Sequence, residues 1–271
     1  MDHPAIHVER IGHGPRVVCV HGSMSHGSEV FESLRALTDA YAVEFIDRRG
    51  FGASPPRPGG VDFDGDADDV AALLGSGAHL VGHSYGAVVA LLATGRRPAL
   101  VRSLTVIEPP AFSLAAGDPA VVALRTRLEP VFPADPDVST GRWLALFVGA
   151  LGSEVPTELP VPDEGEGDVR ASMAERPPWE ATVDLAPIRA AGVPVLVIRG
   201  DWAPDPPGAA VAGAAFRAIS EVVVGGTGGR LLVVADSTHA PQVERPDVVL
   251  PALRAHFAAA DASAAHRPRG S

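Results

Sequence analysis

Short runs of apolar residues recur along the chain, and most of them end in glycine or in polar residues. Runs of this length that are rich in Val, Leu and Ile are typical of buried strands. They cover Arg16–Val20, Ala42–Ile46, His79–Gly82, Ser103–Ile107, Pro194–Ile198 and Leu231–Ala235. Helical periodicity lies between or after them, as in Ala87–Thr94 and Pro246–Ala259. This alternation predicts an α/β fold with a mostly parallel central sheet flanked by helices.

The alternation stops between residues 111 and 180. No run there has the pattern of a strand, and Ala120–Leu128 and Arg142–Leu151 show helical periodicity within Pro-rich and acidic sequence. We therefore expect residues 1–110 and 181–271 to form one core. Residues 111–180 are expected to form a helical lid, inserted after the strand that precedes Glu108.

Composition narrows the class of protein. The hydrophobic share of 46% is ample for a packed core, and the net charge of −11 supplies no excess of cations for a nucleic acid or an anionic membrane. All 22 basic residues are arginine, which excludes Schiff-base chemistry. The single cysteine, Cys19, lies in an apolar run, and we find neither a signal-peptide pattern nor a run of uncharged apolar residues long enough to span a bilayer. A cytoplasmic protein is expected.

The strongest chemical signal is Gly82-His83-Ser84-Tyr85-Gly86, a G-x-S-x-G motif between a predicted strand and a predicted helix. A serine on such a turn is exposed as a nucleophile, and the glycines are needed because side chains at their positions would collide with neighbouring backbone. We expect Ser84 to be the nucleophile.

A second loop, His21-Gly22-Ser23-Met24, follows the strand Arg16–Val20. Acyl transfer needs backbone N–H donors that face the developing oxyanion. We expect the N–H groups of Tyr85 and Ser23 to supply them, with Gly22 in place of Ser23 if the loop is wound differently.

Together these features resemble the α/β-hydrolase superfamily over nearly the full length. His21-Gly22, the block from Asp47 to Ser54 and the motif from Gly82 to Gly86 are similar to its signatures, and Ser237-Thr238-His239 is similar to its histidine loop. The resemblance implies that His239 is the general base, and imidazole is the side chain suited to that role near neutral pH. The block from Asp47 to Ser54 is interpreted as a structural turn.

The acid that orients His239 has three candidates. The common pattern of the superfamily places an aspartate beyond the strand Pro194–Ile198, but alanine stands at that position here, and Asp201 and Asp205 are out of register. Glu108 follows the strand after the nucleophile's helix, where zearalenone lactone hydrolases and haloalkane dehalogenases place their catalytic Glu. We expect Glu108, with Asp201 and then Asp205 as the alternatives.

No His, Cys or Asp cluster has metal-ligand spacing, and the glycine-rich sequence from Gly225 to Gly229 follows no phosphate-loop order. It is interpreted as a flexible turn, and no cofactor or metal is expected. Apolar residues of the predicted lid and the oxyanion loop favour a small hydrophobic ester or lactone as substrate, with Met24, Trp143 and Trp179 as substrate-binding residues.

The expected activity is therefore cleavage of a bulky, hydrophobic ester or lactone through an acyl-enzyme on Ser84. Two alternatives stay open. One is a thioesterase, cyclase or C–C bond hydrolase that uses the same site. The other is a catalytically inactive binding module.

Overall fold

The structure, a computed structural model, describes residues 5–57, 59–132, 134–135, 137–203 and 208–265. Within these residues, seven strands form one sheet in the order β1-β3-β2-β4-β5-β6-β7. All neighbours pair in parallel except β1, which runs antiparallel to β3. The strands are β1 (Val8–Ile11), β2 (Arg16–Val20), β3 (Ala42–Ile46), β4 (Ala78–His83), β5 (Val101–Ile107), β6 (Val195–Gly200) and β7 (Arg230–Val234).

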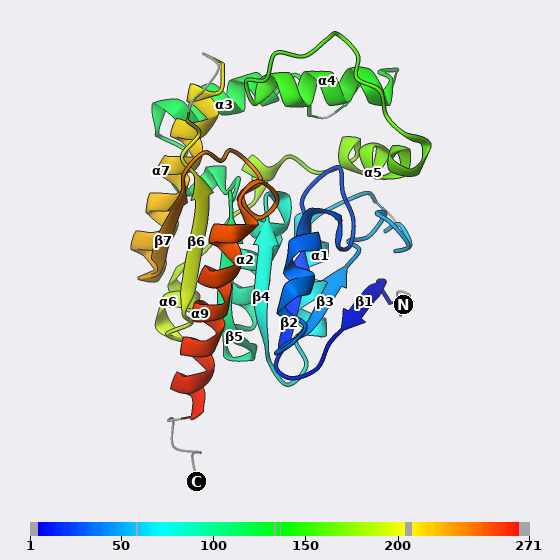
Figure 1. The fold of residues 1–271 in the computed structure, drawn as a ribbon. Helices are drawn as coiled ribbons and strands as arrows, with labels where there is room; N and C mark the ends of the chain where they lie inside the picture. The colour runs from blue at the N-terminus through cyan, green and yellow to red at the C-terminus, as the bar shows by residue number, and fades with distance from the viewer. Residues whose placement is uncertain (1–4, 58, 133, 136, 204–207, 266–271) are drawn as a thin grey trace.

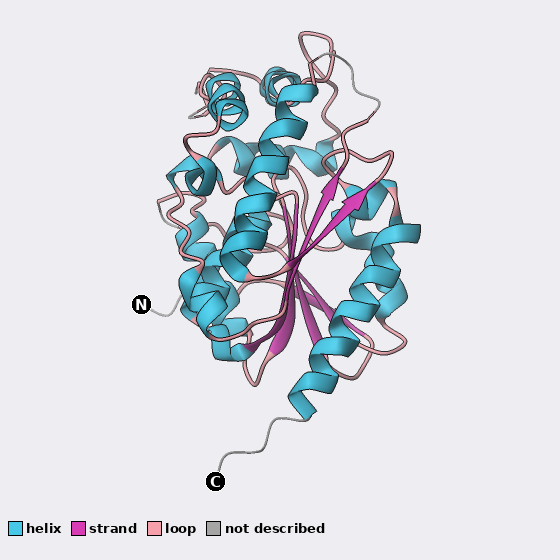
Figure 2. Cartoon of the chain, turned by 90° about the vertical axis from the view of Figure 1, so that its left-hand side faces the viewer, coloured by secondary structure: helices cyan, strands magenta, loops and turns pink. Residues whose placement is uncertain are grey.

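Successive residues of each strand point to opposite faces of the sheet, and each face has its own apolar core. In β2, Val18 and Val20 belong to one core, whereas Val17 and Cys19 belong to the other. Helices α1 (Phe63–Leu73), α2 (Tyr85–Arg96) and α7 (Ala210–Thr227) cover the first face. Helices η1 (Glu29–Leu37) and α9 (Pro246–Ala265) cover the second. Figure 2 shows the twisted sheet between these layers, as the sequence predicts.

The secondary-structure elements in the described part of residues 111–180 are helices, in agreement with the periodicity there. They lie beyond the carboxyl ends of the strands, where Figure 1 shows α3 and α4 above the arrowheads of the sheet. Capping defines two of the helices, because Asp118 accepts from Ala120 N and Ser139 accepts from Arg142 N. The elements of this segment are η3 (Phe112–Ala115), α3 (Pro119–Leu128), α4 (Thr140–Ala150), α5 (Asp163–Met173) and η4 (Pro178–Glu180). The shorter helices elsewhere are η2 (Pro98–Leu100), α6 (Ala186–Ala190) and α8 (Pro241–Glu244).

Two features differ from the sequence-based expectation. The edge strand β1 was not expected, because its sequence, Val-Glu-Arg-Ile, offers little apolar pattern. The supposed flexible turn from Gly225 to Gly229 is mostly helix: α7 continues to Thr227, and Gly228, at φ 77°, ends it in the left-handed conformation. By length and composition α7 could cross a membrane, but it packs Phe216, Ile219 and Val223 into the core.

Candidate active site

Ser84 lies on the sharp turn between β4 and α2. Its backbone angles, φ 52° and ψ −125°, fall outside the regions that a non-glycine residue favours. A Cβ on Gly82 would collide with the carbonyl of Gly86, and a Cβ on Gly86 would collide with the carbonyls of Val20 and His21. The requirement for glycine on both sides of the serine, predicted from the motif, is confirmed.

His239 approaches Ser84 from the loop that follows β7. Its Nε2 lies 2.9 Å from the Ser84 Oγ, within hydrogen-bond distance. Glu244 of α8 holds this loop, because its carboxylate accepts from the Ser237 hydroxyl and from the Thr238 hydroxyl. Residues from two distant parts of the sequence are thus brought into the geometry that a nucleophile and its base require.

Glu108 follows β5 with a positive φ of 48° and is fully buried. Its Oε1 accepts from Gly200 N at 2.8 Å and from Trp202 Nε1 at 3.1 Å. Its Oε2 lies 3.6 Å from the His239 Nδ1, longer than a hydrogen bond, and within the described residues neither atom has another hydrogen-bond partner. The two atoms therefore face each other, as in resting active sites whose hydrogen bonds tighten on substrate binding.

Asp201, the first of the alternative acids, does not share this position. Asp201 follows β6 but turns its Oδ1 toward the backbone N–H groups of Ala203 and Ser237. Asp205 lies outside the described residues. The indole of Trp202, at the turn where the superfamily's usual acid would follow, instead donates to Glu108. Trp202 was missed from the sequence, because nothing in the chain marks an indole as a partner of a distant carboxylate.

Burial acts in opposite directions on the two groups. It raises the pKa of the Glu108 carboxyl to about 8, although the bonds from Gly200 and Trp202 partly oppose this. It lowers the pKa of His239, packed against Phe216, to about 4. Both shifts favour the neutral forms, and a neutral imidazole is the form that can accept a proton from Ser84.

The predicted oxyanion residues lie beside the nucleophile. Ser23 and Tyr85 both line the cavity that holds Ser84 and His239. Tyr85 is the first residue of α2, so its N–H has no acceptor within the helix. Gly22 is packed tightly against the nucleophile, because a Cβ at this position would lie 2.9 Å from that of Ser84.

The cavity is otherwise mostly apolar and narrow, with a free volume of about 30 Å³. Its remaining lining comes from Pro110, Phe112, Leu128, Phe132, Phe147, Leu151, Glu175, Pro178 and Phe216. None of the three residues expected to bind substrate belongs to this set. Trp143 packs inside the insertion and donates to Val131 O, Trp179 borders a separate pocket with Arg125, and Met24 packs against the core. Hydrophobicity alone does not show which apolar side chains line the cavity and which pack elsewhere.

Comparison with known proteins identifies the family of this chain. A sequence model described as the alpha/beta hydrolase family matches residues 17–252. The chain belongs to this family. The solved alpha/beta hydrolase from Sphaerobacter thermophilus has the same fold, with a TM-score of 0.64 at 24% identity over 93% of this chain and 96% of that one.

Two curated relatives of this alpha/beta hydrolase carry named activities. A pimeloyl-[acyl-carrier protein] methyl ester esterase from Methylococcus capsulatus is 33% identical over 66% of this chain and 68% of its own. A 2-(acetamidomethylene)succinate hydrolase from Mesorhizobium japonicum is 37% identical over 38% of each chain. The match thus spans about two thirds of the first relative and well under half of the second.

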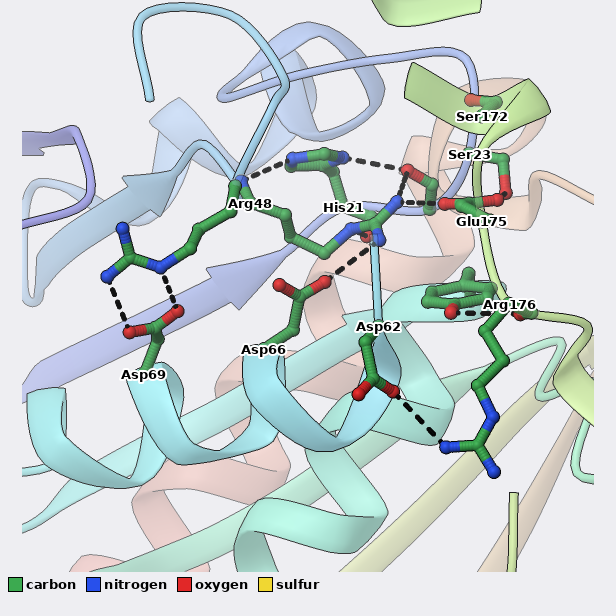
Figure 3. Close-up of polar contacts among 12 residues, drawn as sticks. His21, Ser23, Arg48, Asp62, Asp66, Asp69, Ser172, Glu175 and Arg176 are labelled. Atoms are coloured by element: carbon green, nitrogen blue, oxygen red, sulfur yellow. Dashed lines mark hydrogen bonds and ion pairs between the residues drawn. The ribbon is translucent and has the colours of Figure 1, made fainter. Parts of the chain in front are cut away.

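The block from Asp47 to Ser54, interpreted as a structural turn, also carries a buried cation beside the site. The Arg48 guanidinium is fully buried and pairs with Asp66 at 3.1 Å and Glu175 at 2.5 Å, as Figure 3 shows. It also donates to the carbonyls of His21 and Gly22. The sequence gives no signal for this cluster, because its members come from three separate segments.

One group of side chains in this alpha/beta hydrolase has the composition of a metal site. The possible ligand atoms of His26, Glu29 and Asp168 lie within 4.8 Å of one another. Hydrogen bonds already use the buried Asp168, which lies 2.6 Å from the His26 ring and accepts from Gly52 N. The arrangement is explained by these bonds, and we assign no cofactor to it.

Proposed function

We propose that this protein is a serine hydrolase that cleaves carboxylic esters or lactones through an acyl-enzyme on Ser84. The observation that carries the proposal is the 2.9 Å approach of His239 Nε2 to a serine on a strained strand-to-helix turn. This pairing of nucleophile and base is what activates a serine hydroxyl near neutral pH. The relatedness to an esterase supports the same class of reaction.

In the proposed reaction, Ser84 Oγ attacks the carbonyl carbon while His239 Nε2 accepts the hydroxyl proton. The carbonyl oxygen becomes an oxyanion held by the N–H groups of Ser23 and Tyr85. Glu108, in its carboxylate form, accepts from His239 Nδ1 and stabilises the imidazolium. The imidazolium then gives its proton to the leaving alkoxide, and water attacks the acyl-enzyme with His239 as base, which releases the acid.

The cavity favours an uncharged, apolar acyl group. Phenylalanine and leucine side chains face Ser84, and among the described lining residues the only carboxylate is Glu175. The narrow free volume means that side chains of α3 and α4 must shift to admit a bulky ester. We propose that residues 111–180 serve as a lid for this reason.

A substrate that carries carboxylates, such as the succinate derivative named for the Mesorhizobium relative, fits this lining less well. No arginine is among the described lining residues, and Glu175 would repel an anion. A thioester or a C–C bond could be cleaved by the same machinery, so both belong in the substrate screen.

The test is labelling with a fluorophosphonate, followed by hydrolysis assays on aryl esters, lactones and thioesters. We expect modification at Ser84 and Ser84-dependent hydrolysis of the oxygen esters. Ser84→Ala and His239→Ala should each abolish turnover without unfolding the protein, and the double variant should be little worse, because the residues act as a unit. Absence of labelling would favour the inactive binding module, and full activity of purified Ser84→Ala would refute the assignment.

A further inference from the structure

The loop that carries Ser23 is bound by α5 and by the residues that follow this helix. Asp168, Ser172 and Glu175 recur at helical spacing, so they share one side of this segment. Ser172 Oγ accepts from Met24 N at 2.7 Å, and Ser23 Oγ donates to Glu175 Oε2 at 2.5 Å. A third contact, between Asp168 and His26, extends the row to the end of the loop.

Glu175 also ties this loop to the sheet through Arg48. Its Oε1 accepts from Arg48 Nη2, and the same nitrogen donates to Gly22 O at 2.8 Å. Consecutive loop residues, Gly22 and Ser23, are therefore fixed by one carboxylate–guanidinium unit, visible in Figure 3. Both side chains are fully buried, so breaking their contact would leave a buried charge without its partner.

The loop needs such support. Met24 has a φ of 60°, a strained conformation for a residue with a long side chain. Strained backbone persists only where surrounding contacts over-determine it. Met24 N is bound by Ser172 of α5, and the neighbouring Ser23 is bound by Glu175. Both partners lie in the inserted segment and not in the loop itself.

We propose that Glu175 is a positioning residue that holds the Ser23 N–H against the oxyanion of the reaction. This inference rests on the proposed function. It also implies that the inserted segment supports catalysis directly, through its contacts with the oxyanion loop, in addition to covering the cavity. Because an oxyanion forms only in the tetrahedral state, a looser loop should lower kcat and leave KM nearly unchanged.

The experiment is a double-mutant cycle of Ser23→Ala and Glu175→Gln. Ser23→Ala keeps the backbone N–H and removes only the hydroxyl that joins it to Glu175. Two rates are measured: phosphonylation of Ser84 by a fluorophosphonate, and kcat for p-nitrophenyl butyrate. Each single variant should lose about 10-fold in both, which is less than the about 10²–10³-fold cost of deleting an oxyanion donor. The double variant should lose no more than the worse single one.

The matched control is Glu180→Gln, a nearby exposed carboxylate that pairs with Arg176. It should leave both rates unchanged. Thermal melting checks that each variant is folded. If Glu175→Gln melts below the assay temperature, Ser23→Ala, which breaks the same hydrogen bond from the other side, tests the positioning role on its own.

Multiplicative losses in the double variant, or losses confined to KM, would overturn the positioning role. Unchanged rates in the single variants would do the same. Failure of the unaltered protein to react at Ser84 would refute the proposed function itself, and this inference with it. The two failures are distinguishable by whether Ser84 reacts in the unaltered protein.

Discussion

At the scale of single residues, Ser84 and Glu108 follow adjacent strands, and both have positive φ angles. The turn after β4 and the turn after β5 therefore place a hydroxyl and a carboxylate at the same edge of the sheet. Ligand and catalytic groups gather at this edge in open α/β sheets. His239 joins them from the loop after β7, which brings its ring between the two side chains.

Replacing the acid distinguishes Glu108 from Asp201. Glu108→Gln should lower kcat by about 10²–10⁴-fold, because the imidazole loses the group that fixes its tautomer and stabilises its charge. Asp201→Asn should have a mild effect, since the amide oxygen can still accept from Ala203 N and Ser237 N. Steady-state kinetics on p-nitrophenyl butyrate measure both. If the Asp201→Asn variant lost activity and the Glu108→Gln variant kept it, Asp201 and not Glu108 would be the acid that orients His239.

The same variant should change how stability depends on pH. In the folded protein the Glu108 carboxyl has a pKa of about 8, above its ordinary value of 4.5. The folded state thus binds more protons than the unfolded state between these values, so this group's contribution to the free energy of unfolding is full below 4.5 and is lost as pH rises through 8. Glu108→Gln removes that loss.

We therefore expect Glu108→Gln to gain stability relative to the unaltered protein between about pH 5 and about pH 8. Urea titrations at both pH values measure it, with Glu129→Gln on the exposed surface as the control for removing one charge. Parallel stability curves for the two proteins would show that the Glu108 carboxyl is ionised throughout this range.

At the scale of elements, α3 and α4 border the cavity in which we propose that the acyl group binds. Leu128 comes from the end of α3, and Phe147 comes from the inner side of α4. Phe147 stacks on Trp143 with 5.3 Å between the ring centroids, so Trp143 supports the Phe147 ring. Most of the apolar wall of the cavity thus comes from the inserted segment, and we expect the length of acyl chain that fits to depend on these side chains.

A chain-length series of p-nitrophenyl esters tests this wall. Each methylene that becomes buried should raise kcat/KM by close to fourfold, about 0.8 kcal/mol, until the cavity is full. Phe147→Ala should move the optimum to longer chains. Leu146→Ala, on the exposed side of the same helix, should leave it in place. Activity that is highest on acetate and falls steadily with chain length in every variant would contradict a cavity formed by this wall.

At the scale of the whole molecule, Arg48 connects parts that are far apart in the sequence. Its guanidinium joins the turn after β3 to Asp66 of α1 and to Glu175 of the inserted segment. Phe51 and Tyr85 lie against the same guanidinium, 4.3 Å and 4.7 Å from ring centroid to carbon. The sheet, a core helix and the insertion therefore share one buried charge.

Loss of that charge should destabilise the whole fold. Arg48→Met leaves two buried carboxylates without their cation, and we expect a loss of about 3–5 kcal/mol in the free energy of unfolding. Arg96→Met, which breaks exposed pairs with Asp64 and Asp68, should cost less than about 1 kcal/mol. Denaturant unfolding measures both. Equally small losses of stability in the two variants would show that the Arg48 cluster is hydrated and contributes little to the free energy of unfolding.

The sequence by itself determined the α/β architecture and the residues of the sharp turn that carries Ser84. Apolar runs predict strands because burial requires them, and Gly82 and Gly86 are dictated by collisions with adjacent backbone. Both signals are local, so a single chain displays them. The choice of Glu108 over Asp201 could also be made from the order of strands, and the contact with His239 Nδ1 supports it. The polar edge strand β1 was not predicted from the sequence, because it carries little apolar pattern.

Only the tertiary structure decided what surrounds the nucleophile. Trp143 and Phe147 are aromatic residues on the same side of one helix, yet only Phe147 borders the cavity, because how far a helix extends over a site depends on how the helix is docked. Trp202 and Glu175 carry no sequence motif, and Arg48 lies in a block interpreted only as a turn. Each acquires its role from a partner in another segment. Such contacts depend on burial and on distances between segments, which the fold sets.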